Sequence, residues 1–165
     1  MIVIQDNLLN KNECEELMLM YSTHSDKSIE WYGSHPLKLN NLSNEDLFFS
    51  KQILNMISNF AVSVFGSNLY VERADITKWP PGSDKDYHHD DARDSTFLSS
   101  ITYLNDDYDG GETFFENKLV IIPEIGKTIF FDGKKYLHGV KKVSKNSRYT
   151  IAIWYTDDVN QLIRW

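Results

Sequence analysis

The chain has 165 residues, of which 41% are hydrophobic and 25% are charged, values that are ordinary for a globular domain and exclude wholesale disorder. Its 24 acidic and 17 basic residues give a net charge of −7, which argues against a general binder of nucleic-acid phosphates. No apolar run approaches the ~20 residues of a membrane-spanning helix, and the first residues lack a signal-peptide pattern. One cysteine excludes an internal disulfide, so we expect a soluble, cytoplasmic chain without a membrane partner.

Residues 1–66 carry two helical patterns, within what we expect to be a single domain spanning residues 1–165. The first helix is predicted to begin at Asn10, because Glu13 follows at the spacing of a capping box and apolar residues then recur at helical spacing. The second is predicted over residues 43–65, where one side is apolar and a glycine follows. We expect these helices to support the rest of the domain.

Residues 67–165 form a series of short runs rich in Val, Ile, Thr, Tyr and Phe, separated by turn signals. Many short strands at this spacing predict a sandwich or jelly roll instead of a parallel sheet with crossover helices. Between the two helices we expect a short strand at 29–31 and a mobile loop at 33–41. The predicted strands of the jelly-roll core span residues 69–79, 96–104, 112–122, 127–131, 138–143 and 148–155.

Two adjacent histidines are followed at once by two aspartates. Because side chains alternate along a strand, a His-x-Asp step places an imidazole and a carboxylate on the same face. Two such steps overlap here, His88 with Asp90 and His89 with Asp91, and they point to opposite faces. His138 is the only later histidine. Two histidines and one carboxylate form the facial triad that is typical of non-haem Fe(II) oxygenases, with positions left open for substrates.

Arg148 follows His138 by ten residues and begins the last predicted strand. Alternation places its side chain on one face with Thr150, Ala152 and Trp154. A guanidinium on the inner face would need an anion, and its planar fork suits a carboxylate. An isolated arginine, like an isolated His-x-Asp step, would more simply be a surface residue. The order and spacing of the whole set favour a functional site.

Residues 75–155 resemble the 2-oxoglutarate- and Fe(II)-dependent dioxygenases, in particular their prolyl 4-hydroxylase-like branch. The matching stretches are KWPPGSDKDYHHDD, SITYLNDDYDGGETFF, GKTIFFDGKKYLHGV and SRYTIAIWY. The resemblance implies a mainly β fold with N-terminal helices, namely a double-stranded β-helix (a jelly roll) whose mouth holds iron. It favours the pair His88 and Asp90, because relatives commonly have a second Asp after the ligand. Asp91 would then cap the following turn.

The resemblance also implies roles for individual residues. His88, Asp90 and His138 would be the iron ligands, which makes them catalytic residues. Arg148 would be catalytic as well, because it would bind the distal carboxylate of 2-oxoglutarate. A halogenase is disfavoured, because such an enzyme would need a small residue in place of Asp90.

Three aromatic residues would complete the co-substrate pocket in such a protein. Tyr103 matches a tyrosine that hydrogen-bonds the co-substrate, and Trp79 lies where several relatives have another tyrosine. Trp154 matches a tryptophan that lines the pocket, although core packing would explain it equally well. The loop 33–41 lies where relatives carry a flexible segment that covers the substrate.

The activity implied is oxidative decarboxylation of 2-oxoglutarate to succinate and CO2, coupled to hydroxylation of an unactivated C–H bond. Fe(II) and 2-oxoglutarate would be required, with ascorbate as a candidate reductant. The expected substrate is a proline-containing protein or peptide. The alternatives are hydroxylation of another side chain or a small molecule, and a non-catalytic jelly-roll module that binds a metal or ligand. His24 and His35 are expected to be surface residues.

Overall fold

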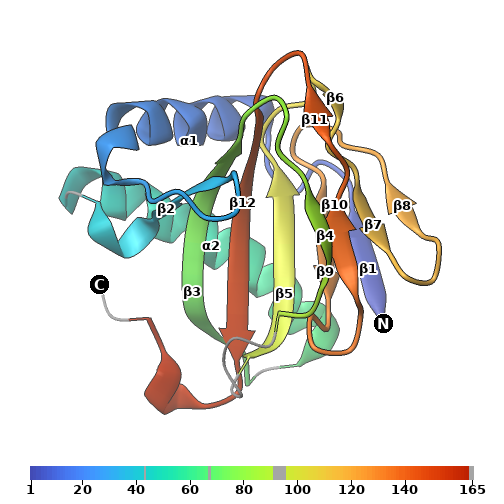
Figure 1. The fold of residues 1–165 in the computed structure, drawn as a ribbon. Helices are drawn as coiled ribbons and strands as arrows, with labels where there is room; N and C mark the ends of the chain where they lie inside the picture. The colour runs from blue at the N-terminus through green and yellow to red at the C-terminus, as the bar shows by residue number, and fades with distance from the viewer. Residues whose placement is uncertain (43, 67, 91–95, 164–165) are drawn as a thin grey trace.

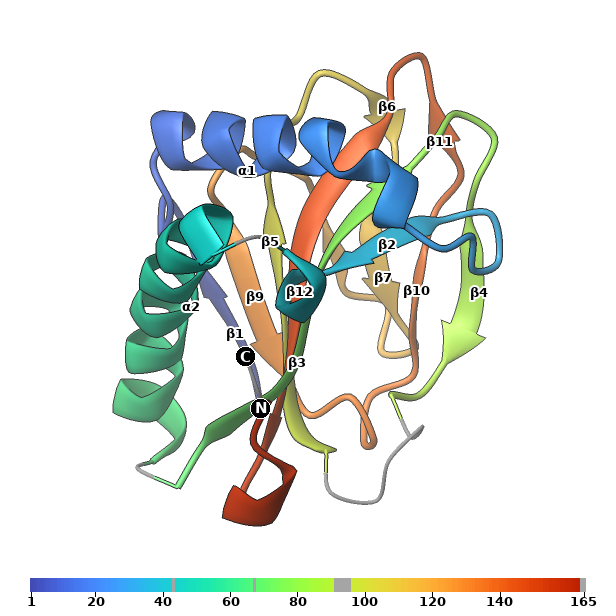
Figure 2. The same cartoon turned by 90° about the vertical axis from the view of Figure 1, so that its left-hand side faces the viewer.

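The structure is a computed structural model that describes residues 1–163, apart from residues 43, 67 and 91–95. A large antiparallel sheet forms its middle layer. Two helices cover one face of this sheet, and a smaller sheet lies against the other face (Figures 1 and 2). The mainly β fold with two supporting helices, as predicted, is confirmed. In the described part of the chain, no helix combines the length and apolar character needed to cross a bilayer.

The two sheets consist entirely of antiparallel pairs. The order in the large sheet is β1 (Ile2–Gln5), β9 (Thr128–Phe131), β5 (Thr96–Tyr103), β12 (Arg148–Thr156), β3 (Tyr70–Trp79) and β2 (His35–Lys38). The order in the small sheet is β4 (Lys85–His88), β10 (His138–Val140), β7 (Thr113–Phe115) and β8 (Val120–Ile121). A separate two-stranded ladder joins β6 (Asp109–Gly110) to β11 (Val143–Ser144), and single 3-10 turns lie at Ser25–Lys27, Leu39–Asn41 and Val159–Gln161.

The first helix, α1 (Lys11–Thr23), begins as the sequence predicts. The Asn10 side chain accepts a hydrogen bond from the Glu13 backbone N–H at 3.1 Å, and the Glu13 carboxylate accepts one from the Asn10 N–H at 2.7 Å. This reciprocal pair satisfies two N–H groups that the helix itself leaves free. The second helix, α2 (Asn44–Phe65), lies over the predicted range, whose residue 43 is outside the described part.

The main core lies between these helices and the large sheet. Ile151, Ile153 and Tyr155 of β12 face it and are fully buried. Phe60 of α2 stacks on Phe130 of β9, with ring centroids 5.3 Å apart. The alternate residues of β12 face the small sheet, so one strand separates the core from the cavity described below.

The expected mobile loop at 33–41 is wrong, and so is the expected strand at 29–31. Residues 35–38 form β2, which pairs with β3 and buries Leu37 completely, so the segment is an edge strand of the large sheet. Pro36 is tolerated there because an edge strand has one unpaired side. Trp31 makes only an isolated bridge to Ser34, around a tight turn. Two further predicted strands, 112–122 and 138–143, are each divided in two: β7 and β8, and β10 and β11.

Candidate active site

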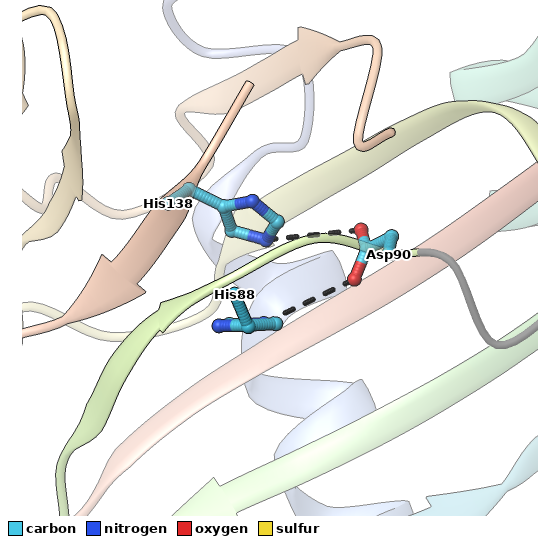
Figure 3. Close-up of side chains that lie close together, drawn as sticks. All are labelled: His88, Asp90 and His138. Atoms are coloured by element: carbon cyan, nitrogen blue, oxygen red, sulfur yellow. Dashed lines mark ion pairs between the residues drawn. The ribbon is translucent and has the colours of Figure 1, made fainter. Parts of the chain in front are cut away.

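The small sheet places two histidines side by side. His88 ends β4, His138 begins β10, and the two are direct partners in the register of this antiparallel pair. Their ring centroids are 4.4 Å apart. Asp90 follows β4 and faces both rings, with carboxylate oxygens 4.0 Å from Nε2 of His88 and 3.7 Å from Nε2 of His138 (Figure 3). One ligand atom from each residue lies within 4.8 Å of the others, so the three could hold one metal ion.

Both imidazoles are oriented in the same way by backbone carbonyls. Nδ1 of His88 lies 3.0 Å from the carbonyl oxygen of Asp86, and Nδ1 of His138 lies 3.0 Å from that of Tyr136. A carbonyl only accepts hydrogen bonds, so each Nδ1 carries the proton and donates it. Each Nε2 therefore presents a lone pair toward Asp90. This second hydrogen bond is the usual support of a metal-binding histidine, so the donor set fits a divalent ion.

Asp90 is held from two sides. Its N–H donates to the carbonyl of Gly133 at 2.9 Å, and Ser99 on β5 donates its hydroxyl to Oδ2 at 2.6 Å. A Cβ at position 133 would lie 2.6 Å from the Cβ of Asp90 and 2.6 Å from Oγ of Ser99. Glycine at 133 therefore lets the aspartate approach the two histidines.

His138 lies in an aromatic environment. Its side chain is almost fully buried, and the ring of Phe131 packs against it with centroids 4.6 Å apart. Burial lowers the pKa of His138, although Asp90 opposes this shift. The neutral imidazole is thus favoured, which is the form that binds metals.

Arg148 is buried, and no acidic partner for it lies among the described residues. Only 1% of this residue is exposed, and no described carboxylate forms an ion pair with it. Its Nη2 lies 3.4 Å from Oγ1 of Thr113, while its Nε has no hydrogen-bond partner among the described residues. The guanidinium lies over the rings of Trp79 and Tyr103, with Cζ of Arg148 5.4 and 5.3 Å from the two ring centroids. A buried cation in this state calls for an anionic ligand.

One cavity of about 390 Å³ connects Arg148 with the three metal-ligand candidates. Its floor is formed by β12 and β3, including Thr150, Ala152 and Trp154 on the face that alternation predicts. Arg148, Trp79 and Trp154 therefore all line the cavity, as do His88, Asp90 and His138.

Tyr103 is fully buried beside this cavity and donates its hydroxyl to Oγ1 of Thr113 at 2.7 Å.

Tyr108 and Thr113 belong to this region and were missed from the sequence. The hydroxyl of Tyr108 is buried without a partner among the described residues, and burial raises its pKa. The signal that could have found it is the Gly110-Gly111 step, which equally suited a turn. A Cβ on Gly111 would lie 2.7 Å from the Tyr108 ring and 3.0 Å from Cδ of Arg148, and its φ of 68° is left-handed.

The other histidines are not brought to the cluster. His24 is not a plain surface residue, because its Nε2 lies 2.7 Å from a carboxylate oxygen of Asp46 and ties α1 to α2. His35 is half-buried in β2. His89 is not part of the cluster and lines a second cavity. Asp91 and the turn that it was expected to cap lie outside the described residues.

The known proteins that this chain resembles include oxygenases, several of which are prolyl hydroxylases. Residues 74–156, about half of the chain, match the model of the 2OG-Fe(II) oxygenase superfamily. Prolyl 3-hydroxylase 2 of Mus musculus is 42% identical over 67 residues, which cover 36% of this chain and 10% of that protein. Prolyl 3-hydroxylase 1 of Homo sapiens is 40% identical over a stretch of the same length. The chain thus spans about a tenth of the length of the curated relatives it matches.

Solved structures share the whole fold. A prolyl hydroxylase from Trichoplax adhaerens, in complex with a hypoxia inducible factor peptide, is 19% identical with a TM-score of 0.75, over 94% of this chain and 83% of that one. The viral collagen prolyl hydroxylase of Paramecium Bursaria Chlorella virus-1 is 20% identical with a TM-score of 0.71, over 93% and 94%. At these identities the likeness concerns the fold, and the predicted double-stranded β-helix is confirmed.

Proposed function

Because the chain belongs to the 2OG-Fe(II) oxygenase superfamily, we propose that it hydroxylates a prolyl residue of a protein or peptide and releases succinate and CO2. Enzymes of this family use Fe(II) and 2-oxoglutarate. One observation supports the proposal most: a cavity joins a cluster of two histidines and one aspartate to a buried arginine that has no described acidic partner.

His88, Asp90 and His138 would hold the Fe(II) ion on one side, leaving its other side open to the cavity. The bound ion would supply the oxygen chemistry that no side chain can perform. The protein's part is to orient the two imidazoles through the carbonyls of Asp86 and Tyr136 and to hold Asp90 through Ser99. Buried aromatic rings would exclude water.

Arg148 would bind the distal carboxylate of 2-oxoglutarate. Its charge is unpaired among the described residues, and its surroundings exclude water, which strengthens an electrostatic contact. Thr113 links it to the hydroxyl of Tyr103, so these two hydroxyls can rearrange to hydrogen-bond the same carboxylate. The hydroxyl of Tyr108, which has no hydrogen-bond partner among the described residues, would supply another donor.

Proline as the target rests on the relatives. The curated matches are prolyl 3-hydroxylases, and the solved structures include a viral collagen prolyl hydroxylase and a prolyl hydroxylase in complex with a hypoxia inducible factor peptide. The aromatic rings of Trp31 and Trp154 at the cavity suit the compact, apolar ring of proline. Product analysis of a hydroxylated peptide would distinguish the C3 and C4 positions of the ring.

The test is succinate formation from 2-oxoglutarate in air with Fe(II), first alone and then with proline-rich peptides. We expect the peptides to stimulate succinate release and to gain the mass of one oxygen atom. His138→Ala should abolish turnover while the far-UV circular dichroism spectrum is retained, and His35→Ala serves as the matched histidine control. Wild-type turnover by His138→Ala would contradict the metal site.

Two results would favour the alternative functions. Stimulation by small molecules but not by peptides would indicate another hydroxylase on the same scaffold. Complete absence of succinate, despite tight binding of Fe(II) and 2-oxoglutarate, would indicate a binding module.

A further inference from the structure

A second cavity of about 260 Å³ lies beside the metal-ligand candidates. It is separate from the end of the first cavity that contains Arg148. The residues that line both cavities are Trp31, Arg73, His88, Asp90 and Trp154. Arg73 is the only cation in this shared set, and the functional site described above does not use it.

Arg73 is held with one edge of its guanidinium occupied and the other free. Nε donates to Oδ2 of Asp75 at 2.8 Å, and Nη2 donates to the same oxygen. The ring of Trp154 lies under the guanidinium, at 4.7 Å from Cζ. No other described residue accepts a hydrogen bond from Arg73, so Nη1 and the outer N–H of Nη2 remain available.

Burial decides the direction in which this free edge faces. The Asp75 side chain is 0% exposed, whereas the Arg73 side chain is 40% exposed. The acid is therefore behind the guanidinium and the accessible space is in front of it. An arginine fixed by a buried acid and a stacked ring loses little rotamer freedom when it binds a ligand, so its fork is pre-organised.

The surrounding charge favours an anion. The chain as a whole has a net charge of −7, yet the described residues that line the two cavities include more cations than anions. The cations are Lys38, Arg73, Lys85 and Arg148, and the anions are Glu72, Asp75 and Asp90. Two more positive charges on a metal ion and two negative ones on 2-oxoglutarate would leave this balance unchanged.

A single molecule of 2-oxoglutarate cannot serve both arginines. Arg148 pairs with Trp79 in the register of β12 and β3, whereas Arg73 pairs with Trp154. These positions are six residues apart along the strands, which is roughly 20 Å. A five-carbon dicarboxylate is far shorter, so the anion that Arg73 binds must belong to another molecule.

We propose that Arg73 binds a carboxylate of the primary substrate, beside the metal site and opposite to the co-substrate end of the cavity. This inference rests on the proposed function and adds a chemical requirement to it: the hydroxylated residue lies next to a carboxylate. That group is either the α-carboxylate of a terminal residue or the side chain of a neighbouring acidic residue. Asp75 and Trp154 are positioning residues for Arg73.

The experiment compares probes that differ only in a carboxylate. Protein loaded with Zn(II) and 2-oxoglutarate, which cannot turn over, is titrated with N-acetyl-L-proline and N-acetyl-L-prolinamide, and separately with acetyl-Glu-Pro-amide and acetyl-Gln-Pro-amide. The indole N–H resonance of Trp154 reports binding. We expect one pair to show roughly tenfold tighter binding of the carboxylate form. The pair that discriminates identifies the source of the carboxylate.

Arg73→Gln should remove the discrimination, and Lys78→Gln should retain it. Lys78 is the matched control because it lies on the same strand but over the ring of Tyr149, away from the cavities. The double variant Arg73→Gln/Asp75→Asn keeps an amide pair and leaves no buried charge unpaired, so it is used if Arg73→Gln folds poorly.

Equal affinity for carboxylate and amide in both pairs would overturn the inference, as would discrimination that survives in the Arg73 variants. The proposed function fails in a different way. If the wild type prefers the carboxylate probes but makes no succinate under turnover conditions, the Arg73 site stands and the enzymatic assignment is lost.

Discussion

The two faces of β12 contain opposite kinds of side chain. Ile151, Ile153 and Tyr155 face the helices and are fully buried among apolar neighbours. Arg148 and Thr150 on the other face are also buried, but they line a cavity that the protein does not fill. The same degree of burial therefore reflects a different role on each face of the strand. The helix-facing side stabilises the fold, whereas the cavity-facing side retains polar groups that are useful only when a ligand pairs with them.

The largest expected loss of stability comes from the helix-facing side. Ile153→Ala removes buried methyl groups from a packed core, so the free energy of unfolding should fall by about 2–5 kcal/mol. The affinity of the folded protein for 2-oxoglutarate should be unchanged. Denaturant unfolding and calorimetric titration measure the two quantities. A loss of affinity as large as the loss of stability would show that the two faces are not separable.

Arg148 should show the reverse pattern. Arg148→Met removes the anchor of the co-substrate and should weaken 2-oxoglutarate binding by about 2–5 kcal/mol, by analogy with charge pairs at interfaces. Because no described acid loses a partner, the ligand-free protein should be no less stable than the wild type. Arg148→Lys, the control that keeps the positive charge, should bind 2-oxoglutarate more tightly than Arg148→Ala does. Unchanged affinity in Arg148→Ala would place the anchor elsewhere.

A smaller effect is expected at Ser99, which orients Asp90 on the cavity side of β5. Ser99→Ala deletes the hydroxyl that donates to Oδ2 and should weaken metal binding by about 10–100-fold. Ser100→Ala is the matched control, because alternation places the next residue on the other face of the strand. Competition with a chelator measures the affinity. Equal affinities for the two variants would mean that the Ser99 contact does not orient the ligand.

The last effect is absent at neutral pH and appears only at alkaline pH, in the helix-facing core. Burial raises the pKa of Cys14 from 9.0 to about 12 and that of Tyr155 from 10.0 to about 12. In the unfolded chain both ionise at their ordinary values, so the folded state binds more protons and stability should fall as pH rises from 9 towards 12. The midpoints of denaturant unfolding, measured at pH values across this range, report the fall in stability. In Cys14→Ala the decline should begin about one pH unit later, at the tyrosine.

Local rules predicted much of this molecule correctly. The capping box at Asn10 and Glu13 depends only on neighbouring residues, so the start of α1 was predictable. The face that Arg148 shares with Thr150 and Trp154 follows from the period of two along a strand. The same rule could have found Arg73 and Asp75, an Arg-x-Asp step on β3. No histidine drew attention to that step.

Long-range pairing was not predictable in the same way. β2 has a weak strand sequence with a proline, and it exists because β3 offers it a free edge. The choice between His88 and His89 was open for the same reason, since alternation treats both alike. The pairing of β4 with β10 brings His88 to His138, and this pairing joins residues 50 positions apart.

That pairing also gives the metal ion a mechanical role. β4 has four residues and only β10 as a described neighbour, so no described strand lies along its other edge. His88 and His138 belong to the small sheet, whereas Asp90 is fastened to Ser99 on the large one. An ion bound by all three would cross-link the two sheets. Amide hydrogen exchange in β4 should then slow when the metal binds. The same ion would thus stabilise the position of β4 and supply the oxygen chemistry.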